Sequence, residues 1–218
     1  MPIRARSTLL LDLDGTLVDP ASGIIACYRH ALAAFEIHPP AAEDMRWVIG
    51  PPIRETFRHF LERSADVEEA VRLYRQRYSE WGLYQAAAYP GVLDALKVHL
   101  RRGARLLLCT AKVTAFARRV VDHFGYSPLL ANVYGAELDG RFENKAELIA
   151  HILAAERLQP TEVCMVGDRK HDVIAATTHG VPTIGVLWGF GDREELETAG
   201  AAMLIERADE LLPPTGSG

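Results

Sequence analysis

Two aspartates separated by one residue follow an apolar run near the N-terminus, in residues 12–16 (DLDGT). Residues two apart in an extended chain point to the same side, so the carboxylates of Asp12 and Asp14 would face one target. Paired carboxylates can bind a metal ion, attack an electrophile or transfer protons. A Ca²⁺ loop counted from Asp12 is excluded, because Leu17 and Gly23 stand where it needs glycine and an acid. A polar turn that closes a strand is the plainer alternative.

A hydroxyl and a lysine stand near the ends of later apolar segments. Thr110 and Ala111 end an expected strand and would offer a hydroxyl and backbone N–H groups at the start of the next helix, which suits an anion. Lys145 opens another expected helix, where the helix dipole disfavours a positive charge unless an anion lies nearby. A helix cap for Thr110 and an exposed surface position for Lys145 are the alternatives.

A second pair of acids follows a third expected strand. The segment 167–172 (GDRKHD) comes directly after an apolar run and contains Asp168 and Asp172. Ligands of a parallel sheet bind beyond the carboxyl ends of its strands. The sequence therefore predicts that two acid pairs, a hydroxyl and a lysine meet at one edge of a sheet.

Short apolar segments alternate with amphipathic segments of helical length, which is typical of a doubly wound, Rossmann-like parallel sheet. The expected strands cover residues 8–13, 105–110, 162–166 and 183–187. The expected helices cover residues 92–100, 114–124, 146–157 and 172–178. We therefore predict an α/β fold with helices on both faces of the sheet.

Residues 18–88 interrupt this alternation, because they contain no convincing strand and at least two helical segments. Apolar residues recur at three- and four-residue steps from Val67 to Trp81, which predicts a long helix with one buried face. We therefore predict a helical cap domain over residues 18–88, inserted into a core domain formed by residues 1–17 and 89–218.

Taken in chain order, these groups resemble the motifs of the haloacid dehalogenase-like (HAD) superfamily of phosphatases over nearly the whole chain. Residues 12–16 are similar to the first motif, Thr110 to the second, Lys145 to the third, and Asp168 with Asp172 to the fourth. The insertion stands where that family has its helical type I cap. A phosphoglycolate phosphatase-like branch, some members of which act on nucleoside 5'-monophosphates, is similar in residues 50–52, 89–92, 138–140, 167–172 and 187–191.

The resemblance implies a Mg²⁺-dependent phosphomonoesterase that forms an aspartyl-phosphate. Asp12 would be the nucleophile and a Mg²⁺ ligand. Asp14 would protonate the leaving oxygen, deprotonate the hydrolytic water and bind Mg²⁺ through its backbone carbonyl. Asp168 would be a further Mg²⁺ ligand, and Asp172 would contact the metal through water or support its ligands.

The phosphoryl oxygens would be held by Thr110, Lys145 and the backbone of Gly15 and Ala111. Members of this branch often carry Asn or Ser after the motif threonine, so Ala111 leaves only its backbone N–H for that contact. Arg54 in the cap could bind a substrate carboxylate or second phosphate, and Trp47 could stack on a base. An exposed arginine and hydrophobic packing are the plainer alternatives.

The expected substrate is a small soluble phosphate ester, either 2-phosphoglycolate or a nucleoside 5'-monophosphate. Asp14 argues against dehalogenation, which has no leaving alkoxide to protonate. Residues 18–88 contain no lysine, which argues against a phosphonatase that forms a Schiff base there. A sugar-phosphate mutase of the same fold and a catalytically silent phosphate-binding module stay open as alternatives.

The composition argues against several other classes of protein. A net charge of −5, from 24 Lys and Arg against 29 Asp and Glu, does not suit a nucleic-acid binder. The apolar runs are far shorter than the roughly 20 residues that span a bilayer, and no signal-peptide core follows the N-terminus. We therefore expect a cytoplasmic protein without a membrane segment. The three cysteines lack C-x-x-C spacing and are expected to be buried rather than to form disulfides or a zinc site.

Overall fold

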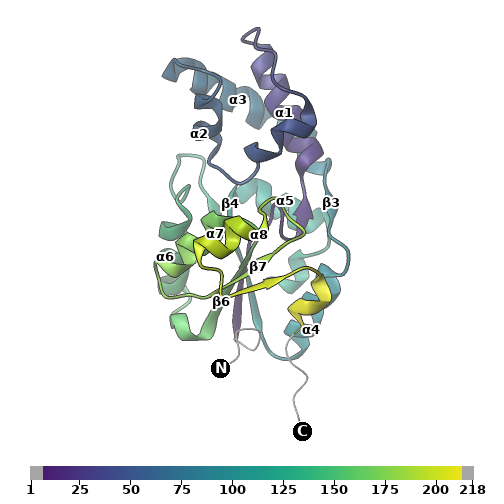
Figure 1. Cartoon of the computed structure of the whole chain (residues 1–218), viewed down its shortest axis with the longest axis vertical. Coiled ribbons are helices and arrows are strands. Elements are labelled where there is room, and N and C mark those ends of the chain that lie inside the picture. The colour runs from purple at the N-terminus through teal and green to yellow at the C-terminus, as the bar shows by residue number, and fades with distance from the viewer. Residues whose placement is uncertain (1–6, 213–218) are drawn as a thin grey trace. The chain divides into compact units, whose positions relative to one another are not determined.

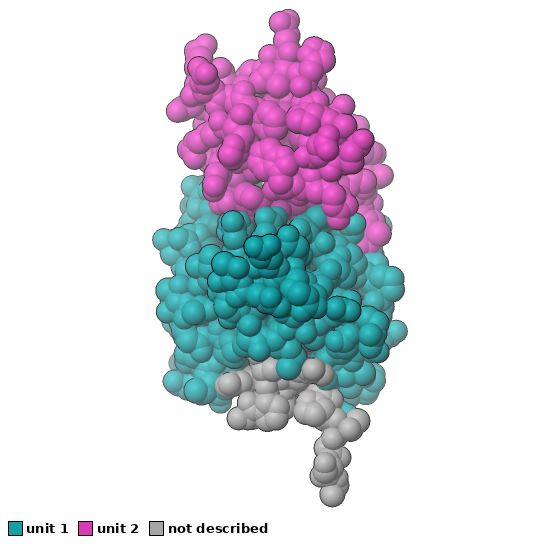
Figure 2. Space-filling view, viewed as in Figure 1, with its two compact units in different colours: residues 1–19, 88–218 teal, residues 20–87 magenta. Residues whose placement is uncertain are grey.

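The computed structural model of the chain describes residues 7–212, and the predicted ends of the core domain, residues 1–6 and 213–218, lie outside the described residues. The chain divides into two compact units, residues 1–19 with 88–218, and residues 20–87 (Figure 2, teal and magenta). The inserted unit was predicted to cover residues 18–88, so it begins two residues later and ends one residue earlier than predicted. The second unit is therefore one continuous insertion into the first.

A six-stranded parallel sheet forms the centre of the first unit, with the strand order β5-β4-β1-β6-β7-β8 (Figure 1). The strands are β1 (Thr8–Leu11), β4 (Arg105–Val113), β5 (Asn132–Ala136), β6 (Val163–Gly167), β7 (Thr183–Val186) and β8 (Met203–Ile205). Every residue of β1 is buried, because β4 and β6 flank its edges and helices cover both faces of the sheet. This position explains why its sequence is a continuous apolar run rather than an alternating one.

Helices cover both faces of this sheet. α4 (Val92–Arg101) and α5 (Thr114–His123) pack against β4 on one face. On the other face, α6 (Lys145–Ala155) packs against β4 and β5, α7 (Lys170–Thr177) packs against β6 and β7, and α8 (Arg193–Ala199) packs beside α7. Short 3₁₀ helices cover Ser127–Leu129, Pro160–Glu162 and Ala208–Leu211. The predicted doubly wound α/β fold is confirmed.

The core of the first unit lies between the sheet and the helices α6 and α7. Leu10, Leu107 and Met165 come from three neighbouring strands and are fully buried against Ile149 and Ile152 of α6. Burying a side chain of this size contributes roughly 1.5–3 kcal/mol to folding. The packing between α6 and the strands therefore holds the N-terminal end of α6 in place beside the sheet.

The second unit is helical. Its helices are α1 (Ala21–Ala33), α2 (Ile53–Arg58) and α3 (Ser64–Glu80), with 3₁₀ helices at Ala42–Val48 and Gly82–Tyr84. The predicted long helix is α3, and its apolar face from Val67 to Tyr78 is buried, while Trp81 lies just beyond its end. The rings of Tyr28 and Tyr74, whose centroids are 4.8 Å apart, join α1 to α3.

Four strands and a helix differ from the prediction. β5 and β8 were not predicted, because Gly135 interrupts the first and the second has only three residues. The short strands β2 (Val18–Asp19) and β3 (Ala87–Ala88) pair at the two ends of a segment that was predicted to contain no strand. α8 has a polar sequence with a single buried residue, Leu196, so its hydrophobic periodicity is weak.

The three cysteines are buried and none forms a disulfide, as predicted: Cys27, Cys109 and Cys164. Among residues 7–212, no helix is both long and apolar enough to cross a membrane.

Candidate active site

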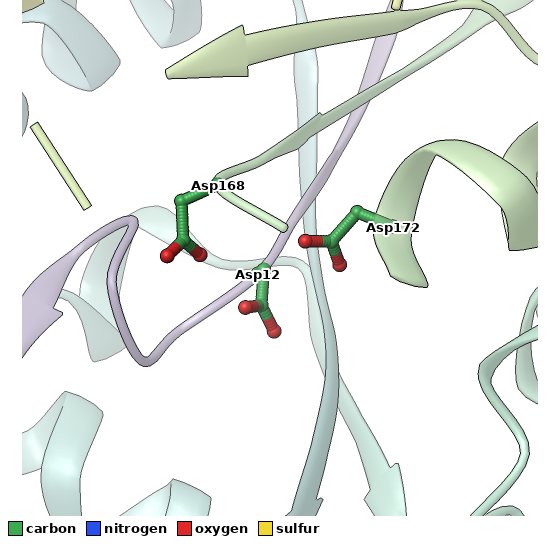
Figure 3. Close-up of side chains that lie close together, drawn as sticks. All are labelled: Asp12, Asp168 and Asp172. Carbon is green, nitrogen blue, oxygen red and sulfur yellow. The ribbon is translucent and has the colours of Figure 1, made fainter. Parts of the chain in front are cut away.

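Three aspartates meet beyond the carboxyl ends of β1 and β6 (Figure 3). Asp12 follows β1 and Asp168 follows β6, and these two strands are neighbours in the sheet. Asp172 lies in the first turn of α7. One carboxylate oxygen of each residue lies within 4.8 Å of the others, and all three residues are buried. The parallel topology brings them together, because parallel strands end at the same edge of a sheet.

Lys145 supplies a positive charge to this acidic cluster. It is the first residue of α6, and its Nζ donates to Asp12 Oδ1 over 2.8 Å and to Asp172 Oδ1. Burial opposes the charged ammonium, but the carboxylates of Asp12 and Asp172 outweigh burial and raise the pKa of Lys145. Lys145 is therefore a buried cation at the cluster, not the surface lysine that was its alternative.

The carboxylate of Asp168 is held by neighbours on both sides. The Thr16 hydroxyl donates to Oδ1 over 3.3 Å and the Phe190 N–H donates to Oδ2 over 2.8 Å. A Cβ atom at Gly15 would lie 2.1 Å from Asp168 Oδ2, and a Cβ atom at Gly189 would lie 2.4 Å from the same atom. The two glycines therefore make the room that the Asp168 carboxylate occupies.

The cluster fits a divalent cation. Burial and the other two carboxylates raise the pKa of Asp168, and burial raises the pKa of Asp172 even though Lys145 opposes the rise. A further positive charge would relieve this repulsion between buried carboxylates. Mg²⁺ prefers oxygen ligands and takes one or two carboxylates together with water or phosphate oxygens. Asp12 and Asp168, with Asp172 beside them, provide such a donor set.

Thr110 and Ala111 lie within β4 rather than at the start of a helix, which corrects the prediction. β4 continues to Val113, and α5 begins at Thr114. The two strands β4 and β5 change register between Cys109 and Val113, so Thr110 stands in an irregular part of the strand. The Thr110 hydroxyl is buried and accepts a hydrogen bond from the Lys112 N–H over 3.3 Å.

The backbone N–H of Gly15, which was predicted to bind phosphate, already donates a hydrogen bond within the protein. The Gly15 N–H donates to the Val18 carbonyl over 2.8 Å. Gly15 has a φ of 87°, which favours glycine, and it closes the turn that follows Asp14. What Gly15 provides in this structure is a tight turn and room for Asp168.

Asp14 is ion-paired with a residue to which the sequence analysis gave no role. Lys112 Nζ lies 2.6 Å from each carboxylate oxygen of Asp14. The side chains are 6% and 16% exposed for Lys112 and Asp14. Burial raises the pKa of Asp14, and the ammonium of Lys112 opposes the rise. Lys112 stands two residues after Thr110, but the register of β4 is irregular between Cys109 and Val113, so strand alternation alone did not predict this pair.

The contacts that the loop after β7 makes with Asp168 and Thr16 were also not predicted. The Trp188 indole donates to the Thr16 carbonyl over 3.1 Å, and Phe190 is bonded to Asp168 as described above. The loop after β7 therefore fixes both Asp168 and the turn after Asp14. The glycines in residues 187–191 were the signal for a close backbone approach.

Arg54 and Trp47 belong to the second unit. Arg54 in α2 donates two hydrogen bonds to Glu68 of α3, with distances of 2.8 Å for Nε–Oε1 and 3.1 Å for Nη2–Oε2. This bidentate pair is the preferred geometry of an arginine with a carboxylate. The ring of Trp47 is partly exposed and lies 5.1 Å from that of His59 and 6.0 Å from that of Phe60. The predicted substrate contacts of Arg54 and Trp47 stay predictions.

The chain is similar to known proteins over most of its length. Residues 9–186 match the family model described as haloacid dehalogenase-like hydrolase. The chain is 39% identical over 189 residues to a 5'-nucleotidase of Pseudomonas aeruginosa, with 86% of each chain covered. It is 36% identical to the tyrosine-protein kinase PtkA of Mycobacterium tuberculosis over 99% of this chain and 74% of that one. A phosphoglycolate phosphatase of Caulobacter vibrioides is 33% identical, with 91% and 86% covered.

A solved structure supports the same assignment. The crystal structure of a predicted phosphatase from Clostridium acetobutylicum matches with a TM-score of 0.91 and 30% identity, over 94% of this chain and 96% of that one. The family match over residues 9–186 spans the positions of Asp12, Lys145, Asp168 and Asp172. The chain belongs to the haloacid dehalogenase-like hydrolase family.

Proposed function

We propose that this protein, a HAD-family phosphatase, is a Mg²⁺-dependent phosphomonoesterase that hydrolyses 2-phosphoglycolate or a nucleoside 5'-monophosphate through an aspartyl-phosphate on Asp12. One observation carries the proposal: Asp12 Oδ1 lies 2.8 Å from the buried ammonium of Lys145, next to the carboxylates of Asp168 and Asp172. A carboxylate that attacks a phosphate dianion needs positive charge beside it, because the two anions otherwise repel each other. The relatives named as a 5'-nucleotidase and a phosphoglycolate phosphatase support the choice of substrate classes.

The proposal gives a role to every predicted site residue except Gly15 and Arg54. Asp12, Asp168 and the backbone carbonyl of Asp14 would hold Mg²⁺, and Asp172 would contact it through water. Bound Mg²⁺ would neutralise charge on the phosphoryl oxygens and on the attacking carboxylate. The phosphoryl oxygens would be held by Lys145, the Thr110 hydroxyl and the Ala111 N–H.

The reaction has two steps. In the first, an Asp12 carboxylate oxygen bonds to phosphorus while the ester P–O bond breaks, and Asp14 gives its proton to the departing oxygen, which leaves as an alcohol. In the second, a water oxygen bonds to phosphorus while Asp14 takes a proton from that water and the bond between phosphorus and Asp12 breaks. The products are the alcohol and inorganic phosphate, and both aspartates return to their starting states.

The test is phosphate release from 2-phosphoglycolate, the common nucleoside 5'-monophosphates and several sugar phosphates, each measured with Mg²⁺ and with EDTA. We expect one class to be hydrolysed far faster than the others, and only with Mg²⁺. Isomerisation of β-glucose 1-phosphate without hydrolysis would instead identify a mutase. Because one relative is named as a tyrosine-protein kinase, the panel includes ATP with a tyrosine peptide, and phosphopeptide formation in place of phosphate release would overturn the proposal.

The Asp12→Asn variant tests the nucleophile. It removes the attacking charge but keeps the size of the side chain, so turnover should be lost while the unfolding temperature stays near that of the wild type. Asp122→Asn is the matched control, because Asp122 is an exposed aspartate of α5. A full rate in Asp12→Asn contradicts the aspartyl-phosphate, and phosphate binding without turnover in the wild type would identify a silent binding module.

A further inference from the structure

We propose that Lys112 is a positioning residue for Asp14, which it orients and whose carboxylate it stabilises when the leaving group departs. This inference rests on the proposed function, in which Asp14 protonates the leaving oxygen. Nothing in the motifs of the sequence analysis gives Lys112 this role. Three observations support it: the geometry of the ion pair, its burial, and the backbone irregularity that presents Lys112.

The ion pair is close and symmetric. Lys112 Nζ lies 2.6 Å from Asp14 Oδ1 and 2.6 Å from Asp14 Oδ2, so the ammonium sits between the two oxygens. A carboxylate held at both oxygens has lost rotation about its terminal bond. The Lys112 side chain is 6% exposed, whereas an isolated surface lysine would be mobile and hydrated. Lys112 therefore fixes the direction in which Asp14 points.

The backbone of β4 is irregular at Lys112. Cys109 pairs with Tyr134 of β5, but the next pairing joins Val113 to Ala136, so β4 carries extra residues across this interval. A bulge of this kind redirects side chains and is frequent next to active sites. A Cβ atom at Gly135 would lie 2.4 Å from the Lys112 carbonyl oxygen. The glycine in β5 therefore lets the bulged backbone at Lys112 pack against its neighbour.

The chemistry of the first step explains why the pair would matter. The observed contacts are those of an ionised Asp14, which is the state that Asp14 reaches once its proton has passed to the departing alkoxide. The negative charge left by that transfer lies on a carboxylate that is mostly removed from water. An uncompensated charge in such a place is unfavourable, and an ammonium already in contact with both oxygens compensates it without rearrangement. Lys112 would therefore accelerate the departure of leaving groups that need a proton.

The experiment compares two leaving groups in the Lys112→Met variant. The first substrate is an alkyl ester, either AMP or 2-phosphoglycolate, whichever the wild type hydrolyses faster, and its leaving oxygen needs a proton. The second substrate is the aryl ester p-nitrophenyl phosphate, from which p-nitrophenolate leaves without a proton. The value of kcat/KM covers the steps up to departure of the leaving group, so the later attack of water does not enter it. General acid catalysis contributes typically 10²–10⁴-fold, so we expect kcat/KM to fall by about 10²-fold for the alkyl ester and by less than about 5-fold for the aryl ester. Lys97→Met is the matched control, because Lys97 lies on α4 outside the acidic cluster with its side chain 44% exposed, and it should leave both values unchanged.

A double-mutant cycle separates positioning from a structural effect. If Lys112 acts through Asp14, then Lys112→Met should change kcat/KM by less than about twofold in a protein that already carries Asp14→Asn. Equal losses on both esters, or a full loss in the Asp14→Asn background, would overturn the role of Lys112 while the phosphatase stands. If Lys112→Met does not fold, Lys112→Gln removes the charge but keeps a hydrogen-bond donor, and the same selective loss is expected. A wild type that hydrolyses neither ester overturns the proposed function, before any variant is compared.

Discussion

Gly189 leaves room for Asp168, so its replacement by alanine should displace a proposed Mg²⁺ ligand. A Cβ atom at this position would lie 2.3 Å from Asp168 Cβ, 2.4 Å from Asp168 Oδ2 and 2.5 Å from the Gly15 carbonyl oxygen. Favourable contacts between such atoms begin near 3.5 Å, so Asp168 or the loop after β7 has to move by about 1 Å. The hydrogen bond from Phe190 to Asp168 lies on the same loop and would move with it.

The magnitude follows from this displacement. A misplacement of about 1 Å at a reacting centre can cost about 10²-fold in rate. Overpacking itself costs about 1–3 kcal/mol of stability, and each kcal/mol lowers Tm by roughly 2–4 °C in a chain of this size. We therefore expect Gly189→Ala to remain folded, to lose about 10²-fold in kcat and to need more Mg²⁺ for half-maximal activity.

The assay is the initial rate of phosphate release as a function of Mg²⁺ concentration, together with a thermal unfolding curve. Gly180→Ala is the control for lost stability alone. Gly180 has a φ of 69° and only Pro160 Cβ, 4.0 Å away, near the added atom, so alanine there is strained by roughly 1–2 kcal/mol but not crowded. Gly180→Ala should lose stability and keep its rate. A folded Gly189→Ala protein with wild-type rate and Mg²⁺ dependence would refute the steric argument.

Three further predictions concern stability and reactivity. His99 is buried, and its Nε2 lies 2.8 Å from the Leu211 carbonyl. Burial lowers the pKa of His99 below 6.5, so the unfolded chain binds the proton more strongly than the folded chain does. The free energy of unfolding should therefore fall as the pH drops from 6.5 towards the pKa of His99 in the folded protein. Urea unfolding at several pH values checks this, and in His99→Gln the pH dependence over that window should flatten. The buried Tyr126 hydroxyl donates to the Leu17 carbonyl over 3.0 Å, so Tyr126→Phe should lower the free energy of unfolding by about 1–3 kcal/mol, and a change near zero would show that water replaces the bond. The three cysteines are buried, so a thiol reagent should label them only as fast as the protein unfolds, and rapid labelling of the native protein would contradict their burial.

The sequence predicted the sheet best where strands are fully buried. β1, β6 and β7 read as continuous apolar runs because helices or neighbouring strands cover them on every side. β5 contains Asn132 and Gly135 and was missed, since its identity as a strand depends on pairing with β4 rather than on its own residues. Propensity and periodicity cannot reveal an element that tertiary pairing creates.

The candidate site was predicted as a set of residues but not as a set of contacts. Asp12, Lys145 and Asp168 were placed together because their strand and helix ends share one edge of the sheet. The partners of Asp14 and Asp168 were missed for a different reason. Lys112 reaches Asp14 through a bulge, and Gly189 approaches Asp168 through a loop, and both depend on backbone geometry that residue types alone do not specify.

The second unit is a single insertion in the first unit, because the chain leaves the first unit after Asp19 and returns to it at Ala88. The entropic cost of bringing the ends of a flexible segment together grows with the logarithm of its length, so each doubling of the insertion lowers the free energy of unfolding by only about 0.6 kcal/mol. The sheet can therefore tolerate insertions of very different size at this place for little loss of stability. Because Asp12, Lys145 and Asp168 all belong to the first unit, the inserted helices can change in sequence and number without rebuilding this cluster of charged side chains.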